Sequence, residues 1–298
     1  RQVLGLVVHN EHRVTDVLPH GAAPITDVLP HGAAPITDVL PHDAVASRGG
    51  GLVELRLQAN GAAHTAWARR VVLATGRAGL GGPALPAFAQ QVPRERWVHS
   101  ADEFDYAALQ GQRVGVIGAG ASAMDSAATA LEAGAASVHL LVRRSDIPRV
   151  NKGKGVSHPG FVHGHARLPD AWKWRIRHYI NVQQVPPPRN STLRVSHWAN
   201  AHFHLGCAVE SIAEHDAALH VQTSLGAIAL DFLIFSTGFK VDWAQRPMLR
   251  HIAPHVRLWK HRYQAPDDDT ELEDSPDLGQ SFEFQLRPGG HCPGLERV

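Results

Sequence analysis

Residues 114–123 read Val-Gly-Val-Ile-Gly-Ala-Gly-Ala-Ser-Ala, and from Gly118 onward they contain the pattern G-x-G-x-x-A. An apolar run precedes this pattern and the alanine-rich stretch 121–132 follows it, which predicts a strand, a tight turn and a helix. Gly118 permits the turn, Gly120 lets the backbone approach a pyrophosphate, and Ala123 keeps the helix close to the strand. Because free N–H groups at a helix start attract anions, the stretch predicts a dinucleotide site. Its candidate residues are Gly118, Ala119, Gly120, Ala121, Ser122 and Ala123.

The next predicted strand, residues 137–142, indicates which dinucleotide binds. Enzymes that use NAD place an acidic residue about 20 positions further on, where it binds the ribose 2′-hydroxyl. Here Arg143 and Arg144 follow the strand, and no acidic residue occurs before Asp146. Residues 143–194 hold eleven Lys or Arg against two Asp, a local charge of +9 that suits a phosphate-rich ligand. Since a guanidinium fork fits a phosphate, the sequence favours NADPH over NADH.

Periodicity and turn residues predict the other elements. Alternating residues on either side of Asn60-Gly61 predict a β-hairpin. The apolar run 71–76 predicts a buried strand that ends on a glycine, and a short helix is expected between residues 99 and 109. Residues 168–180 predict a helix that packs through one face, made of Trp172, Ile176, Tyr179 and Ile180. Later strands are predicted at residues 208–212, 219–223 and 228–235.

An 11-residue repeat occupies residues 15–42. TDVLPHGAAPI spans residues 15–25, recurs letter for letter at 26–36, and begins a third time at residue 37. Each full copy carries two prolines, which exclude a helical repeat. Two and a half copies are also too few for a stacked solenoid. We therefore expect a duplicated segment in a surface loop that is dispensable for folding, because loop closure depends only weakly on loop length.

Composition excludes several classes of protein. The 298 residues are 44% hydrophobic and 19% charged with a net charge of +1, which indicates a globular chain without a strong field for nucleic acid or membranes. The two cysteines exclude a disulfide scaffold and a four-thiolate zinc site. No apolar run approaches the roughly 18 residues that span a bilayer. The chain starts at Arg1, so we expect a piece of a longer protein, cytoplasmic by default, of undetermined oligomeric state.

Histidine is frequent, with 21 residues, and two pairs have the spacing His-x-His. In a strand such a pair shares one face and is able to bind a metal ion. No carboxylate or cysteine follows at a spacing that would supply a third ligand to His163 and His165 or to His202 and His204. We therefore expect no metal site.

Two predicted strands end alike, in Ala-Thr-Gly at residues 74–76 and in Ser-Thr-Gly-Phe at 236–239. Together with His99-Ser100, the glycine pattern and the Arg143-Arg144 pair, these strand ends resemble those of a known group, the flavin-containing and Baeyer–Villiger monooxygenases. The resemblance covers the chain from about residue 51 onward. It implies that Ala74, Thr75, Gly76, Thr237 and Gly238 lie beside a flavin.

The resemblance also implies a fold and an activity. The fold class would be α/β, with a Rossmann-like, three-layer NADPH-binding domain inserted into a partial FAD-binding domain. Residues 1–95 would form the first part of the FAD-binding domain and residues 96–235 the NADPH domain. Residues 236–298 would return to the FAD-binding domain and include an acidic C-terminal segment. The function implied is that of an FAD- and NADPH-dependent oxidoreductase, monooxygenase-like, acting on a small molecule. Hydride would pass from NADPH to FAD, followed by O2 activation or electron transfer.

Two departures from that group leave alternatives open. No strand and glycine loop for the FAD pyrophosphate stands ahead of the repeat, and Pro93 and Glu95 replace the Phe and Gly of the group's F-x-G-x-x-x-H signature. One alternative is a non-catalytic NADP-binding remnant that has lost its FAD site. The other is a flavin-linked reductase without oxygenation. We expect this chain alone to hold FAD weakly or not at all, with FAD belonging to the intact enzyme.

Overall fold

The structure, a computed structural model, describes residues 9–21, 51–266 and 269–298. Its contacts divide the chain into two compact units. Unit 1 comprises residues 1–82 and 240–298, and unit 2 comprises residues 83–239, which interrupt unit 1 in the sequence. The segments that join the units, β4 (Gly81–Pro83) and β13 (Phe239–Val241), pair with each other as a two-stranded sheet.

A five-stranded parallel sheet forms the centre of unit 2, in the order β5-β12-β6-β7-β8. The strands are β5 (Trp97–His99), β6 (Arg113–Ile117), β7 (Ser137–Val142), β8 (Ala201–Leu205) and β12 (Phe232–Phe235). Helix α2 (Ala121–Glu132) connects β6 to β7 and ends before Gly134, whose φ is +90°. The α/β class and the strand–turn–helix–strand order predicted from the sequence are therefore confirmed.

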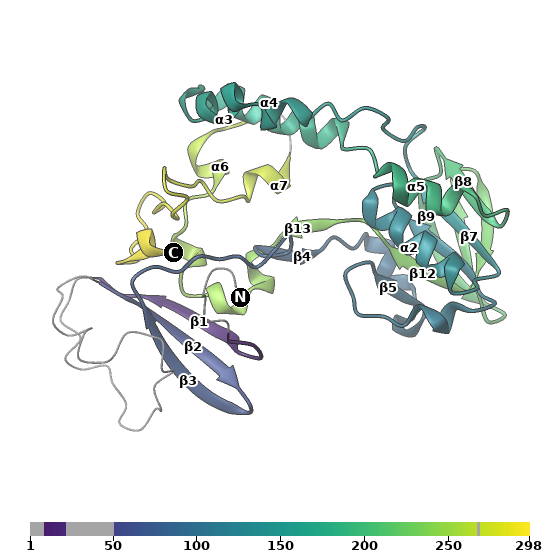
Figure 1. The fold of residues 1–298 in the computed structure, drawn as a ribbon, viewed down its shortest axis with the longest axis horizontal. Helices are drawn as coiled ribbons and strands as arrows, with labels where there is room; N and C mark the ends of the chain where they lie inside the picture. The colour runs from purple at the N-terminus through teal and green to yellow at the C-terminus, as the bar shows by residue number, and fades with distance from the viewer. Residues whose placement is uncertain (1–8, 22–50, 267–268) are drawn as a thin grey trace. The chain divides into compact units, whose positions relative to one another are not determined.

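Two further layers cover this sheet. On one face lie α2 and α5 (Arg189–Ser196), and their apolar side chains share a core with residues of β6, β7 and β12 (Figure 1). On the other face a three-stranded antiparallel sheet encloses a second core. Its strands are β9 (Val209–His215), β10 (Ala218–Thr223) and β11 (Gly226–Leu230). Burial on both faces explains why β12 reads as an unbroken apolar run.

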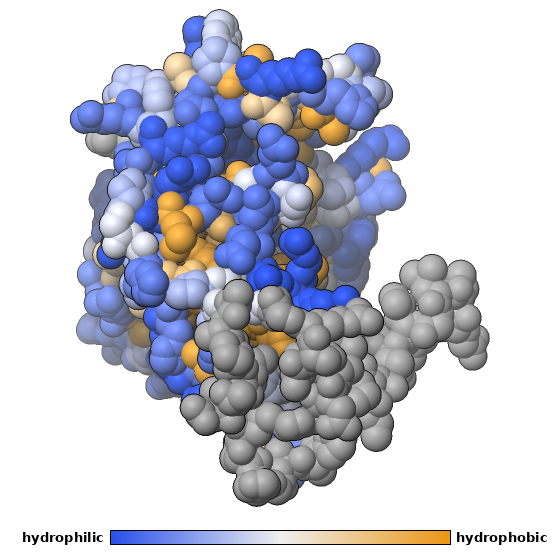
Figure 2. Space-filling view, turned by 90° about the vertical axis from the view of Figure 1, so that its left-hand side faces the viewer, coloured by the Kyte–Doolittle hydropathy of each residue, from blue (hydrophilic) through white to orange (hydrophobic). Residues whose placement is uncertain are grey.

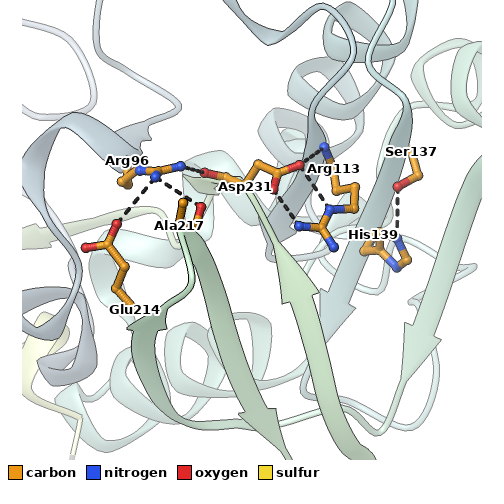
Figure 3. A network of polar contacts seen from close by, with 7 residues as sticks. All are labelled: Arg96, Arg113, Ser137, His139, Glu214, Ala217 and Asp231. Carbon is orange, nitrogen blue, oxygen red and sulfur yellow. Dashed lines mark hydrogen bonds and ion pairs between the residues drawn. The ribbon is translucent and has the colours of Figure 1, made fainter.

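Asp231 separates β11 from β12, so the single strand predicted at residues 228–235 is wrong. The Asp231 carboxylate accepts hydrogen bonds from the Arg113 backbone N–H (2.8 Å) and from two guanidinium nitrogens of Arg113 (2.6 and 3.0 Å). The guanidinium of Arg96 donates to the Asp231 carbonyl (3.2 Å) and to Glu214 (3.3 Å) (Figure 3). This network fixes the amino ends of the parallel strands. It also turns the chain out of one sheet and into the other.

Unit 1 contains an antiparallel sheet in the order β1-β2-β3. Strands β2 (Val53–Ala59) and β3 (Ala62–Ala68) form the predicted hairpin, and both residues of the Asn60-Gly61 turn have positive φ, as a type I′ turn requires. Strand β1 (Arg13–Pro19) contains the start of the first repeat copy. Val17 is buried and the Asp16 carboxylate pairs with Arg250. The surface-loop prediction is thus wrong for residues 15–19, whereas residues 22–50 lie outside the described ranges.

Residues 71–76 do not form the buried strand that their apolar sequence predicts. The side chain of Val72 is 87% exposed. Only one backbone hydrogen bond, from Val71 N–H to the Arg297 carbonyl, ties the segment to a distant part of the described chain. A strand needs a neighbouring strand to satisfy its backbone groups, and the described residues provide none here.

The remaining helices are α3 (Pro159–Gly164), α4 (Asp170–Gln183), α6 (Trp259–Arg262) and α7 (Thr270–Glu273). A 3-10 turn at Tyr106–Leu109 stands where a short helix was predicted. In α4 the predicted packing face is wrong, because Trp172 and Tyr179 are 51% and 47% exposed while Trp174 is buried. Periodicity identifies the residues that share a helix face, but it does not show which face another element covers.

The surface shown in Figure 2 is mostly hydrophilic, with hydrophobic residues in small separate patches. Within the described ranges, no helix combines the length and the apolar character needed to cross a bilayer.

Three histidines meet on neighbouring strands of the parallel sheet. Nδ1 of His139 lies 3.0 Å from Nε2 of His204, and the His139 and His202 rings are 4.7 Å apart. Ser137 Oγ lies 3.1 Å from Nε2 of His139. His139 thus bonds to His204 and to the Ser137 hydroxyl, and the His202 ring lies against it. No group of three His, Cys, Asp or Glu residues in the described part of the chain is arranged to hold a metal ion.

This histidine cluster predicts that acid weakens the fold. Burial, and then the neighbouring His202 and His204, lower the pKa of His139 from 6.5 to about 4. The unfolded chain binds this proton below about pH 6.5 and the folded chain only near pH 4, so the free energy of unfolding falls as the pH decreases between these values. His139→Gln should reduce that fall. Urea denaturation of both proteins at about pH 7.5 and about pH 5 measures it, and an identical pH dependence would contradict the assignment.

Candidate functional site

The glycine turn joins the carboxyl end of β6 to α2. Gly118 has a φ of +139°, and its N–H donates to the Leu141 carbonyl at 3.2 Å, which connects the turn to β7. A Cβ on Gly118 would lie 2.4 Å from the backbone oxygen of Ser236, the residue that follows β12. Only glycine fits here, both for its backbone conformation and for this close approach.

The amino end of α2 is open. A Cβ on Gly120 would meet no atom within 4 Å, in contrast to Gly118. Gly120 is the N-cap of the helix and provides no side-chain hydrogen bond. The N–H groups of the first turn therefore remain unpaired within the described part of the chain, as they do at any helix start without a capping side chain. Ala123 is fully buried against β6, as its predicted packing role requires. The turn thus presents backbone donors and a positive dipole end to open space, an arrangement that suits an anion.

The turn lies where the strand order of the sheet reverses. From β6 the chain continues to β7 and β8 on one side, whereas β12 and β5 lie on the other. Open parallel sheets bind ligands at this position, outside the carboxyl ends of the strands. Gly118, Ser236, Thr237 and Gly238 all follow the carboxyl ends of β6 and β12, and the structure therefore brings the two motifs together within unit 2.

The two arginines after β7 differ in their surroundings. Arg143 is exposed. The guanidinium of Arg144 donates to the Val182 carbonyl at 2.6 Å, in the last turn of α4, and Lys152 donates to Gln183 beside it (2.6 Å). Cations are favourable at the negative end of a helix. Arg144 is therefore already engaged with α4, and Arg143 is the arginine of the pair that faces solvent.

His99 fixes the path of the segment that follows β12, whereas the sequence singled out His99 only as a residue that matches the resembled group. Its side chain is 1% exposed. Nδ1 accepts from the Ala101 N–H (3.2 Å), so Nε2 carries the proton and donates to the Gly238 carbonyl at 3.0 Å. Burial lowers the pKa of His99 and so favours this neutral form. The Thr237 hydroxyl donates to the Ala84 carbonyl at 2.5 Å, which ties the same segment to residues near β4.

The other predicted flavin contacts, Ala74, Thr75 and Gly76, belong to unit 1. All three are exposed, and Gly76 has a φ of +75°. The Gly79 N–H donates to the Gly76 carbonyl (3.0 Å) and closes a turn after them. The structure thus keeps these three residues together at one turn of unit 1.

The sequence is similar to those of known monooxygenases and hydroxylases. A family model described as L-lysine 6-monooxygenase/L-ornithine 5-monooxygenase matches residues 33–171. The FAD-dependent urate hydroxylase of Xanthomonas campestris pv. campestris is 36% identical over 223 residues, which cover 74% of this chain and 47% of that protein. The chain thus spans about half the length of the curated relative that it matches.

Solved structures share the fold. The ornithine N-hydroxylase of Kutzneria sp. 744 gives a TM-score of 0.62 at 15% identity, covering 98% of this chain and 65% of that one. The cadaverine monooxygenase of Erwinia amylovora gives 0.60 at 14% identity, covering 92% and 59%. The family model and the urate hydroxylase confirm the resemblance to flavin-dependent monooxygenases drawn from the sequence. The structural similarity, at such low identity, concerns the fold alone.

The two glycines of the turn should respond differently to the same substitution. Gly118→Ala forces a Cβ into the Ser236 carbonyl and an alanine into a positive φ, so it should lower the free energy of unfolding by about 2 kcal/mol or more. Gly120→Ala meets open space and should cost about 1 kcal/mol or less. Urea denaturation of both variants measures the difference. Equal destabilisation would show that the turn does not have this geometry.

Proposed function

We propose that unit 2 binds NADPH with the pyrophosphate at the amino end of α2. The observation that carries this proposal is the glycine turn between β6 and α2, placed where the strand order reverses. Its candidate contacts are Gly118, Ala119, Gly120, Ala121, Ser122 and Ala123. Backbone N–H groups and the helix dipole would hold the anion there.

Two features of the turn fit such a ligand. The space in front of Gly120 has room for an anion, because a Cβ built on Gly120 would have no other atom within 4 Å. The Ser236 hydroxyl, buried beside Gly118, has no hydrogen-bond partner among the described residues. Open space beside unpaired donors is typical of a site that a polar ligand completes.

We further propose that the chain is part of an FAD- and NADPH-dependent monooxygenase that acts on a small molecule. The matched relative is named FAD-dependent, and the Kutzneria structure is described with reduced FAD, NADP+ and L-ornithine. Residues 1–82 and 240–298 would then belong to the FAD-binding part, with Ala74, Thr75 and Gly76 as candidate flavin contacts. Thr237 and Gly238 are the candidates in unit 2.

Within this function the residues of the chain bind and orient rather than react. NADPH, when bound, supplies a hydride, and FAD accepts it. The glycine turn and α2 would hold the pyrophosphate, and Arg143 would bind the 2′-phosphate. His99 holds the Gly238 carbonyl through Nε2, and Thr237 holds the Ala84 carbonyl. These two hydrogen bonds fix the segment that carries the candidate flavin contacts of unit 2.

Arg143 and Arg144 give a direct test of the cofactor. Arg143→Ala should weaken NADPH binding about tenfold or more, because a charge-assisted hydrogen bond is worth about 1.5–3 kcal/mol, and should leave NADH binding unchanged. Arg144→Ala is the matched control. It breaks the contact with the Val182 carbonyl, so it should lower the melting temperature and change nucleotide preference less. Titration of both nucleotides measures this, and an equal loss for NADH and NADPH in Arg143→Ala would refute the 2′-phosphate assignment.

Flavin content tests the second half of the proposal. The described part of unit 1 leaves Ala74–Gly76 exposed and without a strand partner, so we expect the 298-residue chain to purify with much less than one FAD. The same chain fused at its amino end to a strand, glycine loop and helix of the FAD-binding type should be yellow. Visible absorbance of the two proteins decides the question. A stoichiometric flavin in the short chain would contradict the expectation, and a colourless long one would favour a nucleotide-binding remnant.

A further inference from the structure

Ser236 is joined to the glycine turn from two sides. Its N–H donates to the Ile117 carbonyl at 2.9 Å, at the end of β6. Its own carbonyl lies against Gly118, so closely that a Cβ there would come within 2.4 Å of the oxygen. The Ser236 side chain is in the same place, with its Cβ 3.3 Å from that position. The three atoms nearest to that Cβ position all belong to Ser236.

The hydroxyl of this serine is unsatisfied. It is buried from solvent, and the described residues offer it no hydrogen-bond partner. A buried hydroxyl without a partner destabilises the protein that contains it, and an alanine at the same position would avoid that penalty. The adjacent Thr237 differs, because its hydroxyl already donates to the Ala84 carbonyl. Of the two hydroxyls that follow β12, that of Ser236 is therefore the one still able to form a hydrogen bond.

We propose that the Ser236 hydroxyl donates this hydrogen bond to the pyrophosphate of the dinucleotide. The inference rests on the proposed binding of NADPH at α2 and adds a side-chain donor from β12 to the backbone donors of the turn. A serine hydroxyl reaches a new acceptor by rotation about one bond, so β12 need not move. Hydrogen bonds to a charged acceptor are among the stronger ones, which suits a pyrophosphate oxygen rather than a neutral part of the nucleotide.

The test is Ser236→Ala, studied with two ligands and without any. Affinity for NADP+ should fall roughly tenfold, the loss of one hydrogen bond to a charged group. Affinity for adenosine 2′-monophosphate, which has neither phosphate of the pyrophosphate, should stay unchanged. The melting temperature of the ligand-free variant should equal or exceed that of the parent, because the substitution removes an unpaired buried group. Calorimetric titration and thermal unfolding give these three values.

Ser126→Ala is the matched control. Ser126 is a buried serine of unit 2 whose hydroxyl, unlike that of Ser236, has a partner among the described residues: it accepts a hydrogen bond from the Tyr106 hydroxyl at 3.2 Å. This variant should unfold at a lower temperature and bind NADP+ like the parent. The two variants should thus show opposite changes in melting temperature and in NADP+ affinity. This comparison separates the general effect of removing a buried hydroxyl from the loss of a ligand contact.

Each other outcome overturns the inference. Unchanged NADP+ affinity in Ser236→Ala would show that the hydroxyl does not contact the nucleotide. Equal losses for NADP+ and for adenosine 2′-monophosphate, together with a lower melting temperature, would assign Ser236 a structural role only. If the parent chain itself fails to bind NADP+, the proposed function falls and the inference falls with it. That result differs from a failure confined to the variant.

Discussion

The close approach of the Ser236 carbonyl to Gly118 is the constraint on which the candidate site depends. It joins the carboxyl ends of β6 and β12, the two strands between which the order of the parallel sheet reverses. A side chain at position 118 would separate these ends and displace the start of α2. The same glycine therefore serves the fold and the site, because the open space before Gly120 exists only while the turn is held in place. At the opposite ends of the strands, the pairing of Arg113 with Asp231 provides the corresponding restraint.

The sequence predicts the elements whose stability is local. Helix α2 and strand β7 occupy the residues expected of them, because an alanine-rich stretch and an apolar run, separated by Gly134, specify these elements through their own residues. Predictions fail where a partner decides the outcome. Residues 71–76 have the composition of a buried strand but no neighbouring strand in the described structure. The run 228–235 is apolar throughout except at Asp231, and only the distant Arg113 explains why the chain changes sheets there.

The candidate site shows the same division. The pattern from Gly118 to Ala123 identifies the turn, because those residue types have few other uses at that spacing. Arg143 and Arg144 are equivalent in the sequence, and only the position of the Val182 carbonyl distinguishes them. Ser236 carries no signal of its own beyond its place in a strand end. Its unpaired hydroxyl becomes visible once β12 is placed beside the turn.

The contacts of β1 have a genetic consequence. Asp16 and Val17 hold this strand in unit 1. Both belong to the 11-residue segment that the chain repeats without a single change. Loss of residues 15–25 and loss of residues 26–36 would therefore yield one and the same polypeptide, in which Arg13-Val14 still precedes Thr-Asp-Val-Leu-Pro. An in-frame contraction of the array leaves the coding of β1 intact, wherever in the array it occurs. The number of copies can therefore change without altering the residues that form β1.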